Sequence, residues 1–180
     1  LMAEAVGTHP FIVLADDNGA DAVRTTIAGR VDRAQNLAGE QWETFGRGVN
    51  RVAEAVRRAT GSRTVFHHHC AGFVEAPWEI EKLLAFTEPA RVGLCFDTGH
   101  YRFGGGEDPL AALRQFRDRI WHVHFKDCSP RARQRSQLEG WTYFESLKHG
   151  IFCELGKGDV NFAAIADELR RTNYQGWIMV

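Results

Sequence analysis

Five short apolar runs recur along the chain, separated by longer segments that mix apolar and charged residues. The runs begin at Phe11, Thr64, Val92, Ile120 and Trp177. The first four runs end abruptly in charged or imidazole residues. Strands of a parallel sheet that are buried on both faces have continuous apolar sequences of this kind. Each run therefore predicts a β-strand.

The segments between the runs predict helices. Apolar residues recur at helical spacing from Glu40 to a glycine stop at Gly61. Pro77 and the pair Asp108–Pro109 are typical of helix N-termini, and Asn161 can cap a last helix. We expect one more helix, around 141–149. The remaining expectations are the tail of a helix at 1–8, a loop with a short helical turn at 20–39, and loops at 131–135 and 151–159.

Strands that alternate with helices predict an α/β fold with a parallel sheet. No GxGxxG or GxxxxGK[ST] motif follows any run, so a nucleotide-binding fold is not indicated. Polar strand ends fit a TIM (β/α)8 barrel, in which the site lies at the carboxyl ends of the strands. Residues 1–180 are predicted to form one domain. Because the chain opens on Leu1 and stops at Val180 inside an apolar run, we expect it to be truncated at both ends.

Charge and cysteine content argue against a nucleic-acid-binding protein, a membrane protein and a disulfide-bonded protein. A formal net charge of −1 gives no electrostatic reason to expect a nucleic-acid or membrane partner. No apolar run approaches the ~20 residues of a membrane span, and no segment resembles a signal peptide. The four cysteines form no CxxC pair, so we expect reduced thiols in a cytoplasmic protein.

Imidazoles and a carboxylate stand at the ends of three consecutive runs. Side chains alternate along a strand, so His67 and His69 share one face, as do His122 and His124. In a barrel, one residue of the first pair would converge with Asp97 and His124. This mixture suits a divalent transition metal such as Mn²⁺, Co²⁺, Fe²⁺ or Zn²⁺. The alternatives are that a single histidine is a hydrogen-bonded core residue and that Asp97 only caps the turn after it.

Several motifs resemble those of a known family. The chain resembles the xylose-isomerase-like TIM-barrel family of sugar isomerases, epimerases and dehydratases at FDTGH (96–100), HVHFKD (122–127) and YQGWIMV (174–180). Within that family, it is most similar to the inosose dehydratases, which dehydrate 2-keto-myo-inositol. That likeness lies in HHHCAGFVE (67–75), FDTGHYRFGGGEDP (96–109) and GKGDVNF (156–162).

The resemblance implies roles for individual residues. Asp97 and His124 would be metal ligands, and His100 would contact the substrate. Lys126 and Asp127 would lie beside the substrate as well. The cofactor would be a divalent metal, and the substrate a small polyol or keto-sugar.

The chain departs from the family pattern at two positions. Many members have a glutamate ligand where this chain has His67 or His69, and we favour His67 as the ligand. A further glutamate ligand follows the last strand of the family, beyond Val180. The family barrel has eight strands, so the five runs resemble the last five strands of a partial barrel.

These observations lead to one main hypothesis and its alternatives. The main hypothesis is a metal-dependent lyase that dehydrates a keto-inositol through an enediolate, with His69, His100 and Lys126 as the unranked candidates for proton transfer. The first alternative is a sugar isomerase or epimerase, of the hydroxypyruvate isomerase or ketose epimerase type. The second is a non-catalytic polyol-binding module. An apurinic-site endonuclease is disfavoured because the chain lacks a basic groove. A homo-oligomer is possible under each hypothesis.

Overall fold

A computed structural model describes residue 7 and residues 9–180, so nearly all of the predicted helix tail at 1–8 lies outside the described residues. Its main sheet has five parallel strands in the order β1-β2-β3-β4-β7. They are β1 (Ile12–Leu14), β2 (Thr64–His67), β3 (Val92–Asp97), β4 (Ile120–His124) and β7 (Ile178–Met179). These are the five strands that the apolar runs predict. The predicted parallel α/β sheet is therefore confirmed.

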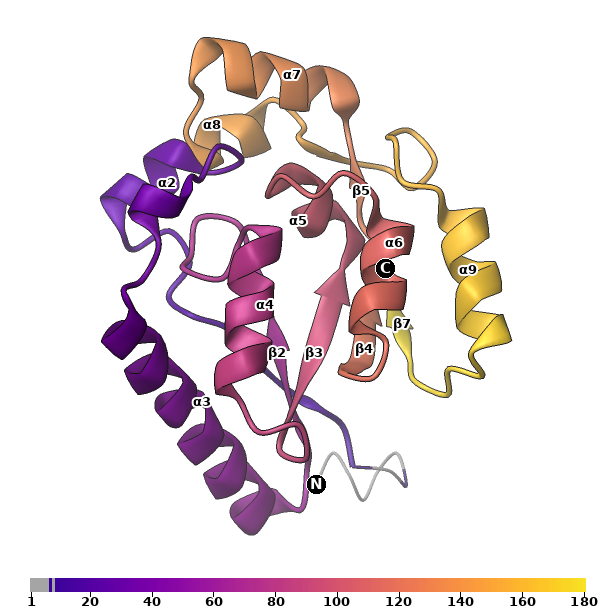
Figure 1. Cartoon of the computed structure of the whole chain (residues 1–180). Helices are drawn as coiled ribbons and strands as arrows, with labels where there is room; N and C mark the ends of the chain where they lie inside the picture. Colours follow the sequence, from indigo (N-terminus) through magenta and orange to yellow (C-terminus); the bar gives the residue numbers. More distant parts are fainter. Residues whose placement is uncertain (1–6, 8) are drawn as a thin grey trace.

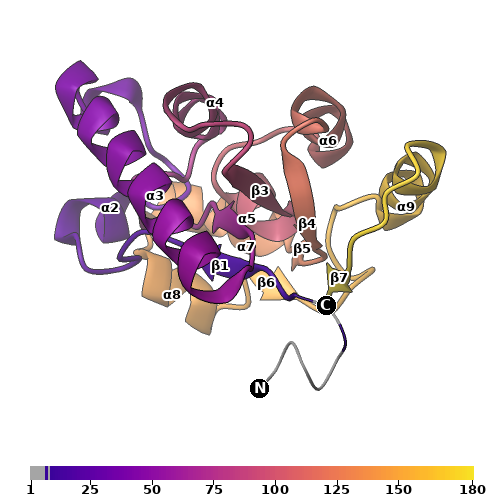
Figure 2. The ribbon, with the colours of Figure 1, turned by 90° about the horizontal axis from the view of Figure 1, so that it is seen from below.

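Four helices line one face of this sheet, which we call the outer face (Figures 1 and 2). They are α3 (Gly39–Thr60), α4 (Pro77–Phe86), α6 (Pro109–Phe116) and α9 (Phe162–Arg171). The predicted caps form: the side chains of Asp108 and Asn161 accept hydrogen bonds from the first turns of α6 and α9. Gly61 ends α3 with a φ of 73°, a left-handed conformation that favours glycine.

The hydrophobic core lies between the outer face and these four helices. Phe66 on β2 and Leu94 and Phe96 on β3 point into it, and all three are buried. The helices contribute buried apolar residues at helical spacing, among them Trp42, Val49, Ile80, Leu83, Leu113 and Ile165. Since side chains alternate along a strand, the opposite, inner face receives the residues between these core positions.

Smaller elements lie across the carboxyl ends of the strands, at the top of Figure 1. They are α2 (Ala22–Ile27), a 3-10 turn (Arg33–Gln35), α5 (Thr98–Phe103), β5 (Asp127–Cys128), α7 (Pro130–Glu139), α8 (Tyr143–Lys148) and β6 (Phe152–Cys153). The loop predicted at 131–135 is wrong, because α7 spans it. The loop predicted at 151–159 is only partly right, because β6 pairs with β5 in a two-stranded antiparallel ladder.

The two edge strands differ from the central strands in exposure. Every residue of β2 and β3 is buried, whereas β1 and β7 leave large apolar side chains in contact with solvent. Among the described residues, no helix combines the length and the apolar character that crossing a membrane requires.

Candidate metal centre

The register of the sheet sets the height of each polar side chain on the inner face. Asp97 on β3 pairs with His124 on β4, and His67 on β2 pairs with Cys95 on β3. The pairing between β3 and β4 shifts after Leu94, where β4 advances two residues for one on β3. Such bulges re-aim side chains and are frequent beside active sites.

The bulge brings the imidazoles of β4 to the inner face. The ring of Trp121 lies over Gly93, where a Cβ atom would come within 2.2 Å of it. Beyond this point His122 and His124 lie on the same side, with ring centroids 5.1 Å apart. The shared face that strand alternation predicts for this pair is confirmed.

Asp97 is the centre of the cluster at the carboxyl end of the sheet. Its side chain is fully buried, and its Oδ1 accepts a hydrogen bond of 2.8 Å from the backbone N–H of His100. This bond caps α5, so the cap that we considered as an alternative role is present as well. It also turns the second oxygen, Oδ2, away from the helix and towards the neighbouring strands.

Asp97 Oδ2 faces three nitrogen atoms. It lies 3.3 Å from His67 Nε2, 3.6 Å from His124 Nδ1 and 3.5 Å from Lys126 Nζ. Although burial raises the pKa of Asp97, the two facing imidazoles and Lys126 hold it well below its usual range. The carboxylate is therefore ionised and able to bind a cation.

The FDTGH motif acquires a physical explanation at this site. Thr98 Oγ1 donates a hydrogen bond of 2.7 Å to the carbonyl of Lys126 and accepts one of 3.0 Å from its N–H. These bonds tie the end of β3 to the end of β4. A Cβ atom at Gly99 would lie 2.7 Å from Lys126 Cγ, so only glycine leaves room for the lysine side chain to pass.

The three consecutive histidines that begin at the last residue of β2 have different surroundings. His68 points away from the cluster, and its Nε2 accepts a hydrogen bond of 3.1 Å from the backbone N–H of Asp97. Burial, with the neighbouring His67, lowers the pKa of His68 to about 3, so its ring is neutral. His68 therefore holds the carboxylate-bearing residue in place.

His69 lies beside the cluster, with its ring centroid 5.4 Å from that of His67 and 3.9 Å from that of His100. Its Nδ1 donates to the carbonyl of Cys70 at 2.8 Å, and its Nε2 lies 3.4 Å from the hydroxyl of Tyr143. Burial lowers the pKa of His69 to about 4. With hydrogen on Nδ1 of the neutral ring, Nε2 is the acceptor nitrogen, and it accepts a hydrogen bond from the Tyr143 hydroxyl.

His100 returns from α5 into the cluster. Its Nδ1 accepts the backbone N–H of Cys70 at 3.2 Å, so the hydrogen of the neutral ring is on Nε2. Nε2 is buried and has no hydrogen-bond partner among the described residues. Burial holds the pKa of His100 well below its ordinary value. His100 thus presents an unpaired donor, which suits a substrate oxygen better than a cation.

Asp127 has a structural role that the sequence did not suggest. Its Oδ1 accepts hydrogen bonds from the N–H groups of Cys128 and Val160, and its Oδ2 accepts them from Gly156 and Gly158. The four bonds measure 2.8 to 3.1 Å, and Asp127 is fully buried. With both oxygens accepting backbone hydrogen bonds, its carboxylate anchors the GKGDVNF loop, and a contact between Asp127 and the substrate stays a prediction.

The donor set fits a divalent metal. A tetrahedral ion with ligand distances of ~2.0–2.2 Å places its ligand atoms roughly 3.3–3.6 Å apart. The distances from Asp97 Oδ2 to His67 and His124 fall in this range. Two overlapping groups of possible ligands have all their ligand atoms within 4.8 Å of one another: His67, Asp97 and His100, and His67, Cys95 and His124. Asp97 and His124 do not occur together in either group, and their link is the 3.6 Å distance between Oδ2 and Nδ1.

Comparison with known proteins places this chain in a family. A family model described as "Xylose isomerase-like TIM barrel" matches residues 3–180. The chain belongs to this family. The five-stranded sheet is accordingly part of a TIM barrel, as the sequence motifs predict.

Curated relatives of this xylose isomerase-like chain include inosose dehydratases. The chain is 33% identical to that of Lacticaseibacillus casei over 149 residues, which cover 83% of this chain and 49% of the relative. It is 35% identical to the rhizopine catabolism protein MocC of Rhizobium meliloti over 187 residues, covering 99% of this chain and 57% of the relative. The chain thus spans about half the length of the curated relatives it matches.

Solved structures share the fold at low sequence identity. The probable 3-DHS dehydratase AsbF of Bacillus anthracis superposes with a TM-score of 0.67 at 16% identity, covering 98% of this chain and 71% of that chain. The IOLI protein, solved with a bound zinc atom, superposes with a TM-score of 0.58 at 16% identity. The superposition covers 99% of this chain and 55% of that chain. These likenesses support the xylose isomerase-like fold.

Proposed function

We propose that this chain carries the metal site of a lyase that dehydrates a keto-inositol such as 2-keto-myo-inositol. The observation that carries the proposal is the buried carboxylate of Asp97, which faces imidazoles from both neighbouring strands at the carboxyl end of the sheet. The inosose dehydratase relatives support the choice of substrate class. The chain spans about half the length of those relatives. The activity of the whole protein is therefore part of this proposal.

Three side chains would hold the cation: His67 through Nε2, Asp97 through Oδ2 and His124 through Nδ1. We favour His67 over His69, because Nε2 of His67 lies 3.3 Å from Asp97 Oδ2, whereas the ring of His69 lies beside that of His100. When bound, a divalent cation would polarise the ketone and stabilise the negative charge that develops beside it.

The chain's own residues would move the protons. His69 would remove the proton α to the ketone through Nε2, the ring nitrogen that carries no hydrogen and that faces the hydroxyl of Tyr143. The ammonium group of Lys126 would donate a proton to the departing β-hydroxyl, which leaves as water. His100 would donate a hydrogen bond from Nε2 to a substrate oxygen. One C–H and one C–O bond break, a C=C bond forms, and no external oxidant or reductant is needed.

The test is turnover of 2-keto-myo-inositol by the metal-loaded protein, followed by ultraviolet absorbance and by mass. We expect a product that has lost one water and gained an unsaturated or dione chromophore. Asp97→Asn should reduce turnover more than the roughly 10–100-fold that losing an outer partner of a metal ligand causes. Asp118→Asn, at an exposed carboxylate, is the matched control and should keep full activity.

Other outcomes would decide against the proposal. A product of unchanged mass would indicate the isomerase or epimerase alternative, which shares the first proton transfer but keeps every hydroxyl. Full activity of Asp97→Asn, or of protein treated with a chelator, would exclude the metal-dependent mechanism. Calorimetric binding of a polyol without any metal dependence and without turnover would favour the binding-module alternative.

A further inference from the structure

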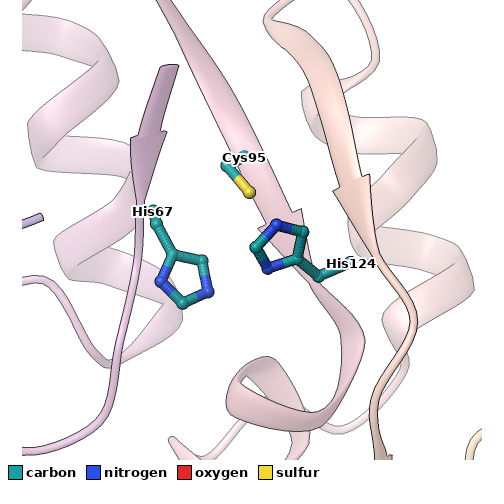
Figure 3. Close-up of side chains that lie close together, drawn as sticks. All are labelled: His67, Cys95 and His124. Carbon is teal, nitrogen blue, oxygen red and sulfur yellow. The ribbon is translucent and has the colours of Figure 1, made fainter. Parts of the chain in front are cut away.

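Cys95 lies on the inner face of β3, two residues before Asp97, between two of the proposed ligands. It pairs with His67 on one side and with His122 on the other. Its Sγ lies within 4.8 Å of ligand nitrogens of His67 and His124. Figure 3 shows the sulfur directed into the space between these two rings. Three side chains from three adjacent strands therefore form a second possible ligand set, one step deeper than the oxygens of Asp97.

The surroundings of Cys95 differ from those of another buried cysteine near the site. The thiol of Cys70 lies 3.4 Å from the carbonyl oxygen of His100 and donates a hydrogen bond to it. The thiol of Cys95 has no hydrogen-bond partner among the described residues, although it is fully buried. A thiol that only filled space would be expected among apolar side chains. Cys95 instead faces two imidazoles.

We propose that Cys95 supplies a thiolate ligand to the cation that His67 and His124 hold. This inference rests on the proposed metal centre and specifies its chemistry. The S–H bond of Cys95 is replaced by a sulfur–metal bond, and the proton is released to solvent, with no change of oxidation state. Asp97 and Cys95 together would then contribute two negative charges, which balance a divalent cation bound by two neutral imidazoles.

A thiolate would change which metals the site prefers. Carboxylate and water ligands alone suit Mg²⁺ and Mn²⁺, whereas sulfur with imidazole favours softer ions such as Zn²⁺ and Co²⁺. The inference therefore predicts that the chain binds Zn²⁺ and Co²⁺ in preference to Mn²⁺. Replacing the sulfur by oxygen in Cys95→Ser should reduce this preference by at least about tenfold, an affinity change of roughly 1.4 kcal/mol.

Cobalt spectroscopy tests the inference, because a bond between Co²⁺ and a thiolate gives an intense near-ultraviolet charge-transfer band. The full chain is titrated with Co²⁺ as wild type, Cys95→Ser and Cys153→Ser. Cys153 is only partly buried, on β6, and serves as the matched control. We expect one cobalt per chain in all three proteins. The band should appear in the wild type and in Cys153→Ser, and it should be absent from Cys95→Ser.

The outcomes separate this inference from the proposed function. Cobalt bound by the wild type without a charge-transfer band would overturn the role of Cys95 and leave the centre of Asp97, His67 and His124 intact. A band that survives in Cys95→Ser would assign the sulfur to another cysteine and also overturn it. If the wild type binds no cobalt, the proposed metal centre fails, and the inference fails with it. Absence of the band from the cobalt-loaded wild type overturns the role of Cys95 even if a variant folds poorly.

Discussion

The centre of the sheet and its two edges are built from similar residues but have different environments. Leu94, Cys95 and Phe96 on β3 are completely buried, between the outer helices and the inner face. On the edge strand β1, Val13 is 46% exposed, and on β7, Met179 is 54% exposed. Hydrophobic stabilisation is proportional to the apolar area removed from water. The central strands should therefore contribute most of the stability, and the candidate metal centre lies on them.

Shortening a side chain at the centre should destabilise the fold far more than at the edge. Leu94→Ala should lower the free energy of unfolding by about 3 kcal/mol, because it leaves a cavity in a packed core. Val13→Ala removes fewer buried atoms and should lower it by under about 1 kcal/mol. Urea denaturation of both variants measures the difference. Equal losses at the two positions would show that the edge is packed as tightly as the centre.

Asp127 extends the comparison to the loops over the carboxyl ends. Asp127→Asn should lower the free energy of unfolding by about 2 kcal/mol, because one of the two oxygens becomes an amide that cannot accept the N–H bonds directed at it. Metal affinity should stay within about twofold in the folded protein. The exposed variant Asp118→Asn again serves as control. A large loss of metal affinity with unchanged stability would instead show that Asp127 acts at the metal centre.

Acidification should lower the free energy of unfolding through the buried imidazole of His68, at the centre of the sheet. His68 has a pKa of about 3 in the folded chain and about 6.5 when unfolded. Between these values the unfolded chain binds more protons, so stability is complete above pH 6.5 and declines as the pH falls. At pH 5.5 the loss from this one group is about 1.4 kcal/mol. Urea denaturation of the metal-free chain at pH 7.5 and 5.5 measures it, and equal stability at both values would contradict the neutral, buried imidazole.

The smallest effect is expected for a charge placed on the edge. Val13→Lys should change the free energy of unfolding by under about 0.5 kcal/mol, since the side chain is half exposed. Lysine on an edge strand opposes pairing with another sheet. Self-association measured by analytical ultracentrifugation should therefore decrease or stay absent. A destabilisation of several kcal/mol would show that β1 is buried in solution.

The sequence predicts the central strands well because their apolar runs and polar ends coincide with the buried sheet and the site. It does not predict α7, whose only buried residues are Ala132 and Ser136, so no apolar stripe marks the helix. The signals present were Ser129, which caps the helix, and Pro130 at its first position. The six-residue α5 and the two-residue strands β5 and β6 are too short for periodicity to reveal.

The sequence likewise predicts only part of the candidate metal centre. Strand alternation predicts the convergence of His67, Asp97 and His124, because all three lie on strands. The roles of His68 and Asp127 depend on backbone N–H groups that are distant in sequence, about 30 residues away in each case. Residue type and spacing carry no information about such partners. Cys95 appears in the sequence as one more apolar position of its strand, and only the register places it beside two imidazoles.

The central claim is that His67, Asp97 and His124 bind one common cation. The most direct measurement is a crystal structure of the chain grown with Co²⁺ and recorded at the cobalt absorption edge. We predict a single anomalous peak within ~2.0–2.2 Å of His67 Nε2, Asp97 Oδ2 and His124 Nδ1. A peak bound elsewhere, or no peak while the three side chains keep their positions, would contradict the account.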